Sequence, residues 1–123
     1  MLTVATAAMA QAEPDLQGVT KPNGYTVSVY SQLQPININQ IHSWVIRIRN
    51  PKGVPIDDAK VSVDGGMPEH DHGLPTTPKV TRQLGNGEYL LEGLKFHMHG
   101  WWQISFSISI SGVKDSVVID LNL

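Results

Sequence analysis

The stretch Trp102-Gln-Ile-Ser-Phe-Ser-Ile-Ser-Ile-Ser111 alternates a large apolar side chain with a polar one over its whole length. Alternation with a period of two is typical of a β-strand that has one face buried and the other in water. Serines and one glutamine occupy the polar face, so the buried face is unambiguous. The stretch therefore predicts the longest strand of the fold.

Six further segments have strand patterns of the same kind. The sharpest is His42-Ser-Trp-Val-Ile-Arg-Ile-Arg49, in which Trp44, Ile46 and Ile48 fall on one side. Turn residues such as Asn50-Pro51-Lys52-Gly53 and Gly85-Asn86-Gly87 separate the segments. The remaining strands are expected at residues 25–31, 59–64, 79–84, 88–92 and 116–121. About seven short strands without a helical period predict an all-β fold, an immunoglobulin-like β-sandwich.

The length and the N-terminal pattern predict the domain organisation. A chain of 123 residues is expected to form one domain, which we place at residues 25–123. Residues 1–12 hold a small apolar run ending in Ala8-Met9-Ala10, which fits the remnant of a signal peptide. Residues 13–24 hold two prolines and two glycines and are expected to be a flexible leader. These features predict an exported protein, with the periplasm as its location.

Composition excludes several classes of function. The formal charge is −2 and no cluster of Lys and Arg occurs, which argues against nucleic-acid binding. No segment approaches the roughly 20 apolar residues of a membrane span. The absence of cysteine removes thiolate nucleophiles, thiolate zinc sites and the Cys ligand of blue copper. Neither a Gly-x-Ser-x-Gly motif nor a useful pair of carboxylates is present, so we do not expect an enzyme.

Two short segments hold four of the five histidines. The first, rich in Gly and Pro, offers Met67, His70 and His72, and the second offers His97, Met98 and His99. In extended backbone, residues i and i+2 lie on the same side, so each His-x-His pair can converge on one point. Imidazole nitrogen with thioether sulfur favours copper, and Cu(I) in particular. All six residues are therefore candidate metal ligands.

Other readings of these residues remain open. Zinc is an alternative to copper, with Glu69 or Asp71 as an oxygen ligand. The histidines of the Gly/Pro loop can also serve only hydrogen bonding and solubility, in a module that docks a partner protein without metal. By phase, Met98 and Trp102 fall on the core side of the last long strand, whereas Trp101 falls outside and is available to shield a metal. His42 is in phase with the buried Trp44 and is expected near one end of the sandwich.

The chain also resembles the FixH-like and YtkA-like small exported domains. The resemblance is carried by Asp64-Gly-Gly-Met-Pro-Glu-His-Asp-His-Gly-Leu-Pro-Thr76, Gly87-Glu-Tyr-Leu90, Phe96-His-Met-His-Gly-Trp101 and Pro51-x-Gly53-x-Pro55. It covers roughly residues 44–110. It implies an immunoglobulin-like β-sandwich that is exported or membrane-tethered and associated with copper handling or cytochrome oxidase maturation.

Together these observations predict a periplasmic metal-binding protein, with copper as the metal, that acts as a carrier, buffer or assembly factor. Its partner is then expected to be a copper-handling or oxidase-assembly protein. The alternative is a protein–protein interaction module of the cell envelope that binds no metal. The sequence leaves the oligomeric state open.

Overall fold

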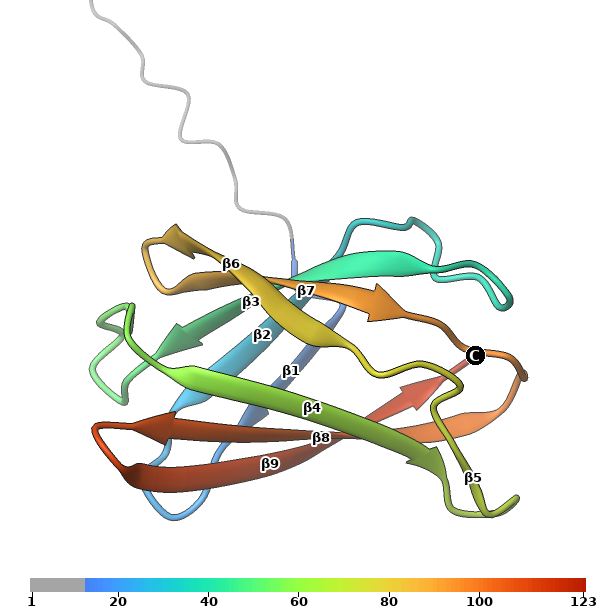
Figure 1. Ribbon diagram of the computed structural model, residues 1–123. Helices are drawn as coiled ribbons and strands as arrows, with labels where there is room; N and C mark the ends of the chain where they lie inside the picture. The colour runs from blue at the N-terminus through green and yellow to red at the C-terminus, as the bar shows by residue number, and fades with distance from the viewer. Residues whose placement is uncertain (1–12) are drawn as a thin grey trace, which may run out of the picture.

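The structure is a computed structural model that describes residues 13–123, so the predicted signal-peptide remnant at residues 1–12 lies outside the described residues. The described chain is built from nine β-strands (Figure 1). Their bounds are β1 Leu16–Val19, β2 Thr26–Ser31, β3 His42–Arg49, β4 Lys60–Met67, β5 His72–Gly73, β6 Lys79–Gly85, β7 Glu88–Leu94, β8 Trp101–Ile110 and β9 Val113–Asn122. The seven expected strands are all present, and β1 and the two-residue β5 are additional.

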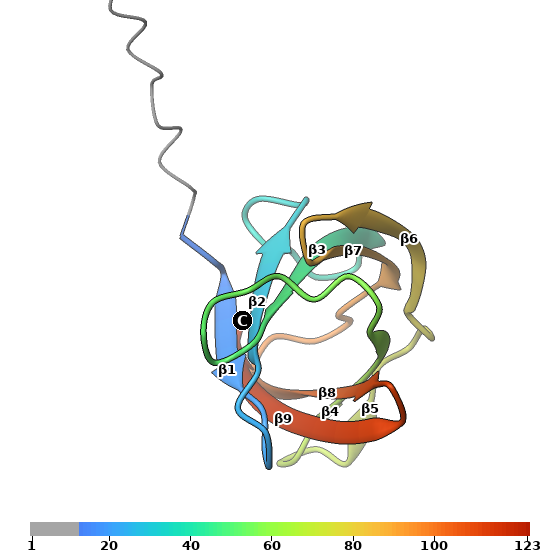
Figure 2. The ribbon, with the colours of Figure 1, turned by 90° about the vertical axis from the view of Figure 1, so that its left-hand side faces the viewer.

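The strands form two antiparallel sheets that pack face to face (Figure 2). One sheet has the order β1-β2-β3-β7-β6 and the other has the order β5-β4-β8-β9. Once β1 and β5 are set aside, the orders β2-β3-β7-β6 and β4-β8-β9 are those of the ABED and CFG sheets of an immunoglobulin constant domain. The predicted β-sandwich is therefore confirmed. Between residues 13 and 123 the structure has no helix that is long and apolar enough to cross a membrane.

The core lies between the sheets and follows the alternation seen in the sequence. In β8 the side chains of Trp102, Ile104 and Phe106 are fully buried, while the polar residues between them, Gln103 and Ser105, face outward. In β3 the burial pattern alternates from His42 to Arg49 in the same way. Because each strand contributes one apolar face, the two sheets cover each other and remove both faces from water.

Three large aromatic rings connect the two sheets. Trp44 belongs to β3, Trp102 to β8, and Phe96 to the connection between β7 and β8. The ring centroid of Phe96 lies 5.9 Å from that of Trp44 and 5.1 Å from that of Trp102. All three side chains are fully buried. Phe96 therefore fixes the β7–β8 connection to both sheets, with distances typical of favourable aromatic pairs.

Tyr89 of β7 anchors the connection between β3 and β4. Its hydroxyl donates a hydrogen bond to the Ile56 carbonyl and accepts one from the Ala59 amide at 3.0 Å. Burial raises the pKa of the Tyr89 phenol above its usual value, so the phenol keeps its proton and remains a donor.

Residues 13–24 differ from the expected flexible leader. Leu16–Val19 pairs with β2, with Leu16 opposite Val29, and so adds an edge strand to the first sheet. Gly18 allows β1 to lie directly against β9, because a Cβ there would approach side-chain atoms of Val117 and Ile119 within 3.0 Å. The sequence did not predict β1, because four residues, one of them Gly, are too few to show the alternation typical of a strand.

A buried carboxylate holds the turn between β1 and β2. Asp115 of β9 is only 4% exposed and accepts hydrogen bonds from the Thr20 hydroxyl at 2.7 Å, the Asn23 amide at 2.8 Å and the Asn23 side chain. Burial by itself raises the pKa of Asp115, but these hydrogen bonds outweigh it and hold the pKa below its usual value. The ionised carboxylate therefore stabilises the attachment of the turn to the second sheet.

Asp115→Asn should lower the free energy of unfolding at neutral pH by about 1–3 kcal/mol, since it leaves buried donors without an acceptor. A lowered native pKa contributes stability at neutral pH that is lost as the pH falls through that pKa, so the difference from the wild type should shrink below about pH 4. Urea unfolding at several pH values measures this. Asp58→Asn, at an exposed position, is the control and should cost less than about 1 kcal/mol. Equal losses in both variants would contradict the anchoring role of Asp115.

Candidate metal centre

The first histidine segment is a tight hairpin between β4 and β5. Met67, Pro68, Glu69 and His70 form a β-turn closed by a hydrogen bond from the His70 amide to the Met67 carbonyl at 3.1 Å. Pro68 occupies the second position of the turn, where its fixed φ is favourable. Asp71 then takes φ +53°, a left-handed conformation that aspartate tolerates better than most residues. The chain thereby reverses and returns as β5.

The hairpin places His72 beside Met67. Met67 is the last residue of β4 and His72 the first of β5, and the two are directly opposite in the antiparallel ladder. Opposite residues direct their side chains to the same face, with Cβ atoms about 4.5–5.5 Å apart. Met67 is only 1% exposed, whereas His72 is exposed. The pair therefore joins a buried thioether to an imidazole that solvent can reach.

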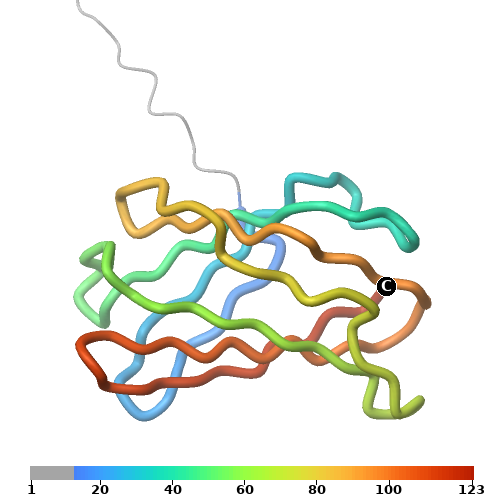
Figure 3. Tube along the Cα trace, viewed as in Figure 1, coloured from blue at the N-terminus to red at the C-terminus, as the bar shows by residue number. Residues whose placement is uncertain are grey.

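The second histidine segment is the connection between β7 and β8, residues 95–100 (Figure 3). Phe96 enters the core, and His97 is half-buried with its ring 5.6 Å from the ring of Trp102 in an edge-to-face arrangement. The Trp102 indole donates a hydrogen bond to the Met98 carbonyl at 3.0 Å. The core tryptophan thus fixes the backbone around His97.

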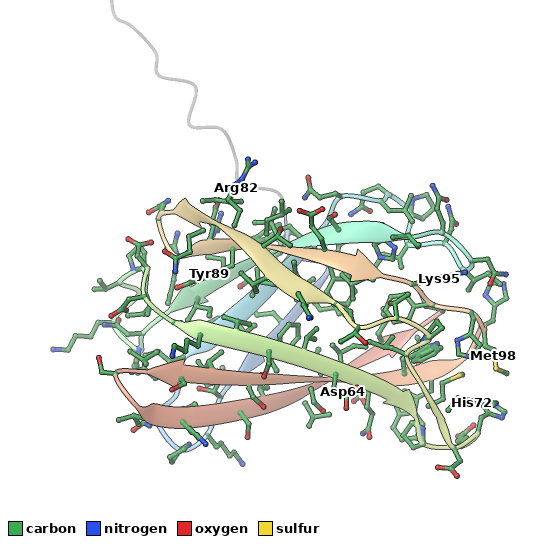
Figure 4. The ribbon with its side chains drawn as sticks, in the orientation of Figure 1. Asp64, His72, Arg82, Tyr89, Lys95 and Met98 are labelled. Carbon is green, nitrogen blue, oxygen red and sulfur yellow. The ribbon has the colours of Figure 1, made fainter. Side chains whose placement is uncertain are left out.

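The two segments meet through their imidazole rings. The centroids of His72 and His97 are 5.6 Å apart, and those of His70 and His72 are 6.5 Å apart. His72 is therefore the central member of a row of three histidines at the end of the sandwich that carries β5. Figure 4 labels His72 at this end and shows Met98 there too.

His97 carries a buried nitrogen without a partner. Its Nδ1 is removed from solvent and makes no hydrogen bond within the described part of the chain. Leaving a buried polar atom unsatisfied costs free energy, and a bound ion is one explanation for such an atom. Among the described residues, His42 Nε2 and Trp44 Nε1 are buried without a hydrogen bond in the same way. A metal ion bound to His97 Nδ1 would satisfy that nitrogen.

Nitrogen and oxygen groups alone do not complete a site here. Across residues 13–123, no three side chains among His, Cys, Asp and Glu gather closely enough to hold a metal ion. The exposed carboxylates of Glu69 and Asp71 therefore give a zinc site little support. The structure does bring the rings of His72 and His97 together, and it places Met67 opposite His72 in the β4–β5 ladder. Two imidazoles and a thioether are donor types that suit Cu(I).

The other candidate residues lie further from this set. His70 is exposed and stacks on His72. His99 is exposed and, among the described residues, takes part in no ring contact. Residues 95–100 are not part of a strand, so the alignment of His97 and His99 that strand backbone would give stays a prediction. Met98 is half-buried and packs against the edge of the core, as its phase predicted.

His42, Trp101 and Trp102 are the remaining residues for which the sequence predicted a position. His42 is 8% exposed, contacts the rings of Trp44 and Phe96, and places Nδ1 2.9 Å from the Gln40 carbonyl. It therefore caps the end of the core, as expected. Trp102, not Trp101, forms the wall behind His97, while the Trp101 indole donates to Asp120 at 2.8 Å. The alternation in the sequence correctly placed Trp102 in the core, but it did not predict the contact between Trp102 and His97.

Gly100 allows the connection to close over Met67. Its φ is +132°, which residues with a side chain rarely adopt, and a Cβ there would lie 2.9 Å from the Met67 methyl carbon. Its amide and carbonyl also pair with Leu123, which brings the C-terminus to the same end of the molecule (Figure 1).

Gly100→Ala should lower the free energy of unfolding by about 1–3 kcal/mol through backbone strain and should also displace the Met67 side chain. Thermal or urea unfolding measures the first effect, and the methyl resonance of Met67 reports the second. Gly112→Ala is the matched control, because Gly112 also has a positive φ, +80°, but has no atom near its Cβ position. A Met67 resonance unchanged in Gly100→Ala, or shifted as much in the control, would contradict the close approach.

Comparison with known proteins identifies the family. The model of the family described as YtkA-like matches residues 20–107, which contain both histidine segments, the strands β2 to β7 and most of β8. The chain matches no curated protein and no solved structure. Because the matched range covers well over half of the 123 residues, the chain belongs to the YtkA-like family.

Proposed function

We propose that this YtkA-like protein binds copper, as Cu(I), at the end of the sandwich where the β4–β5 hairpin meets the β7–β8 connection. The observation that carries the proposal is the contact of His72 and His97, with ring centroids 5.6 Å apart, beside the buried Met67. Two imidazoles and a thioether match the preference of Cu(I) for soft and borderline ligands. A bound ion would also satisfy the buried Nδ1 of His97, which makes no hydrogen bond within the described residues.

The proposed role is that of a carrier or buffer, without catalysis. His70 and His72 are exposed, and His72 also lines a surface depression of about 360 Å³ beside Met67. A site that is open on one side can receive an ion and release it to another protein. We place this role in the periplasm, with a copper-handling or oxidase-assembly protein as the partner that exchanges the metal.

Replacing both His72 and His97 by Ala should weaken Cu(I) binding by at least about a hundredfold, because loss of an outer-shell partner alone costs about 10–100-fold in metal affinity. Competition with a chromophoric Cu(I) chelator under anaerobic conditions measures the affinity. His99→Ala is the matched control, since His99 makes no ring contact with the row of histidines. Wild-type protein that takes no Cu(I) from a chelator of micromolar affinity, or a double variant that binds as well as the control, would refute the proposal.

A second substitution tests the sulfur ligand. Met67→Leu nearly conserves volume and should cost less than about 1.5 kcal/mol of stability, so the fold remains intact. It should weaken Cu(I) binding about tenfold or more and leave Zn²⁺ binding unchanged, because a thioether contributes affinity for soft ions only. Met98→Leu serves as the control for the other methionine. If Met67→Leu changes both metals equally, the role assigned to the sulfur is wrong, and metal binding rests on the imidazoles alone.

A further inference from the structure

A second surface feature lies at the opposite end of the β5-β4-β8-β9 sheet, where β4 begins and β9 begins (Figure 1). A depression of about 620 Å³ lies there. Three lysines line it, Lys21 from the β1–β2 turn, Lys60 from β4 and Lys114 from β9. We propose that this depression, defined here as the lysine pocket, binds an anion of the phosphate monoester class.

The register of the strands explains why the lysines surround one place. Ser109 of β8 is directly opposite both Lys60 of β4 and Lys114 of β9, so the two lysines flank it on the same face of the sheet. Neighbouring strands are about 4.8 Å apart, which separates the two lysine backbones by roughly 10 Å. Long flexible stems allow both ammonium groups to converge above the serine.

The third lysine is brought in by the β1–β2 turn. The backbone of Lys21 pairs with Ser116 through two hydrogen bonds of 3.0 Å, which extends the sheet beyond β9. The same turn is held by Asp115, as described above. The backbone of Lys21 is therefore fixed at the rim, and its exposed side chain extends from that position.

The charges at the rim are not balanced within the protein. Lys21, Lys60 and Lys114 are exposed, and within residues 13–123 none of them forms an ion pair. The one carboxylate in the lining, Asp115, already accepts hydrogen bonds from Thr20 and Asn23. Three positive charges close together repel one another, and an anion between them would remove that repulsion.

The floor offers hydroxyl donors. Ser62, Ser107, Ser109 and Ser116 line the depression, and within the described chain their hydroxyl groups have no hydrogen-bond partner in the protein. A tetrahedral oxyanion with two negative charges can accept from several hydroxyls and ammonium groups at once, and Lys is a common phosphate ligand. A monovalent carboxylate has fewer oxygens and less charge for this set. The volume lies in the range of small-ligand pockets, so it can hold a phosphate together with part of the group that it esterifies.

The test uses metal-free protein with chelator present, so that it is independent of copper binding. Inorganic phosphate and glycerol phosphate are titrated while amide resonances are followed, and we expect saturable shifts around Ser107 and Lys114. Lys60→Gln combined with Lys114→Gln should raise the dissociation constant about tenfold or more, because it removes two charged donors. Lys52→Gln combined with Lys79→Gln is the matched control. It changes the net charge equally at exposed lysines outside the pocket and should bind as the wild type does.

A second arm distinguishes the source of the phosphate. Flotation with phosphatidylcholine vesicles that contain phosphatidic acid tests a lipid headgroup, with pure phosphatidylcholine vesicles as the reference. Binding to the soluble esters supports a small metabolite as the ligand of the lysine pocket. Binding to the phosphatidic acid vesicles alone supports a lipid headgroup. Either conclusion requires that the Lys60 and Lys114 variant loses this binding. Absence of binding in both arms, or an equal loss in the control variant, would overturn the proposal.

Discussion

The contact of Phe96 with Trp44 and Trp102 is the constraint on which the rest of the structure depends. The chain has no cysteine, so no disulfide joins the sheets. In immunoglobulin domains a disulfide joins strands B and F, which correspond to β3 and β8 here, and these strands hold Trp44 and Trp102 instead. The three rings bury a large apolar area between the sheets. They also fix the β7–β8 connection to the core through Phe96, directly before the half-buried His97.

The two ends of one sheet have different chemistry for a simple geometrical reason. The edges of the sandwich are closed by β1 against β9 and by β6 beside β4, so the strand ends are where side chains of several elements come together. At one end the β4–β5 hairpin and the β7–β8 connection bring imidazoles and a thioether together. At the other end the β1–β2 turn adds a lysine to two that the strands already present. The outer face between these ends is covered mainly by serine and other small polar residues.

Much of the candidate site was predictable because its residues are unusual in type and spacing. Met67, His70, His72 and His97 were identified from the sequence, and the structure brings His70, His72 and His97 into one row. The alignment of His97 and His99 assumed strand backbone, whereas residues 95–100 lie between β7 and β8 and Gly100 has a positive φ, so His99 stays a prediction that no contact among the described residues supports. The contact between His97 and Trp102 was not predictable, since both residues had been assigned to opposite sides of one continuous strand.

The sequence by itself determined the β-strands, their buried faces and most of the turns, because alternation and turn chemistry are properties of neighbouring residues. Only the tertiary structure decided which distant segments meet. His72 lies near His97 because β4 pairs with β8 so that Gly66 is opposite Gln103, which places the end of one strand beside the start of the other. In the same way, residues 13–24 are held in place by pairing with β2, by contact with β9 and by hydrogen bonds to Asp115. Such contacts depend on register and packing between strands far apart in the chain, which no local pattern specifies.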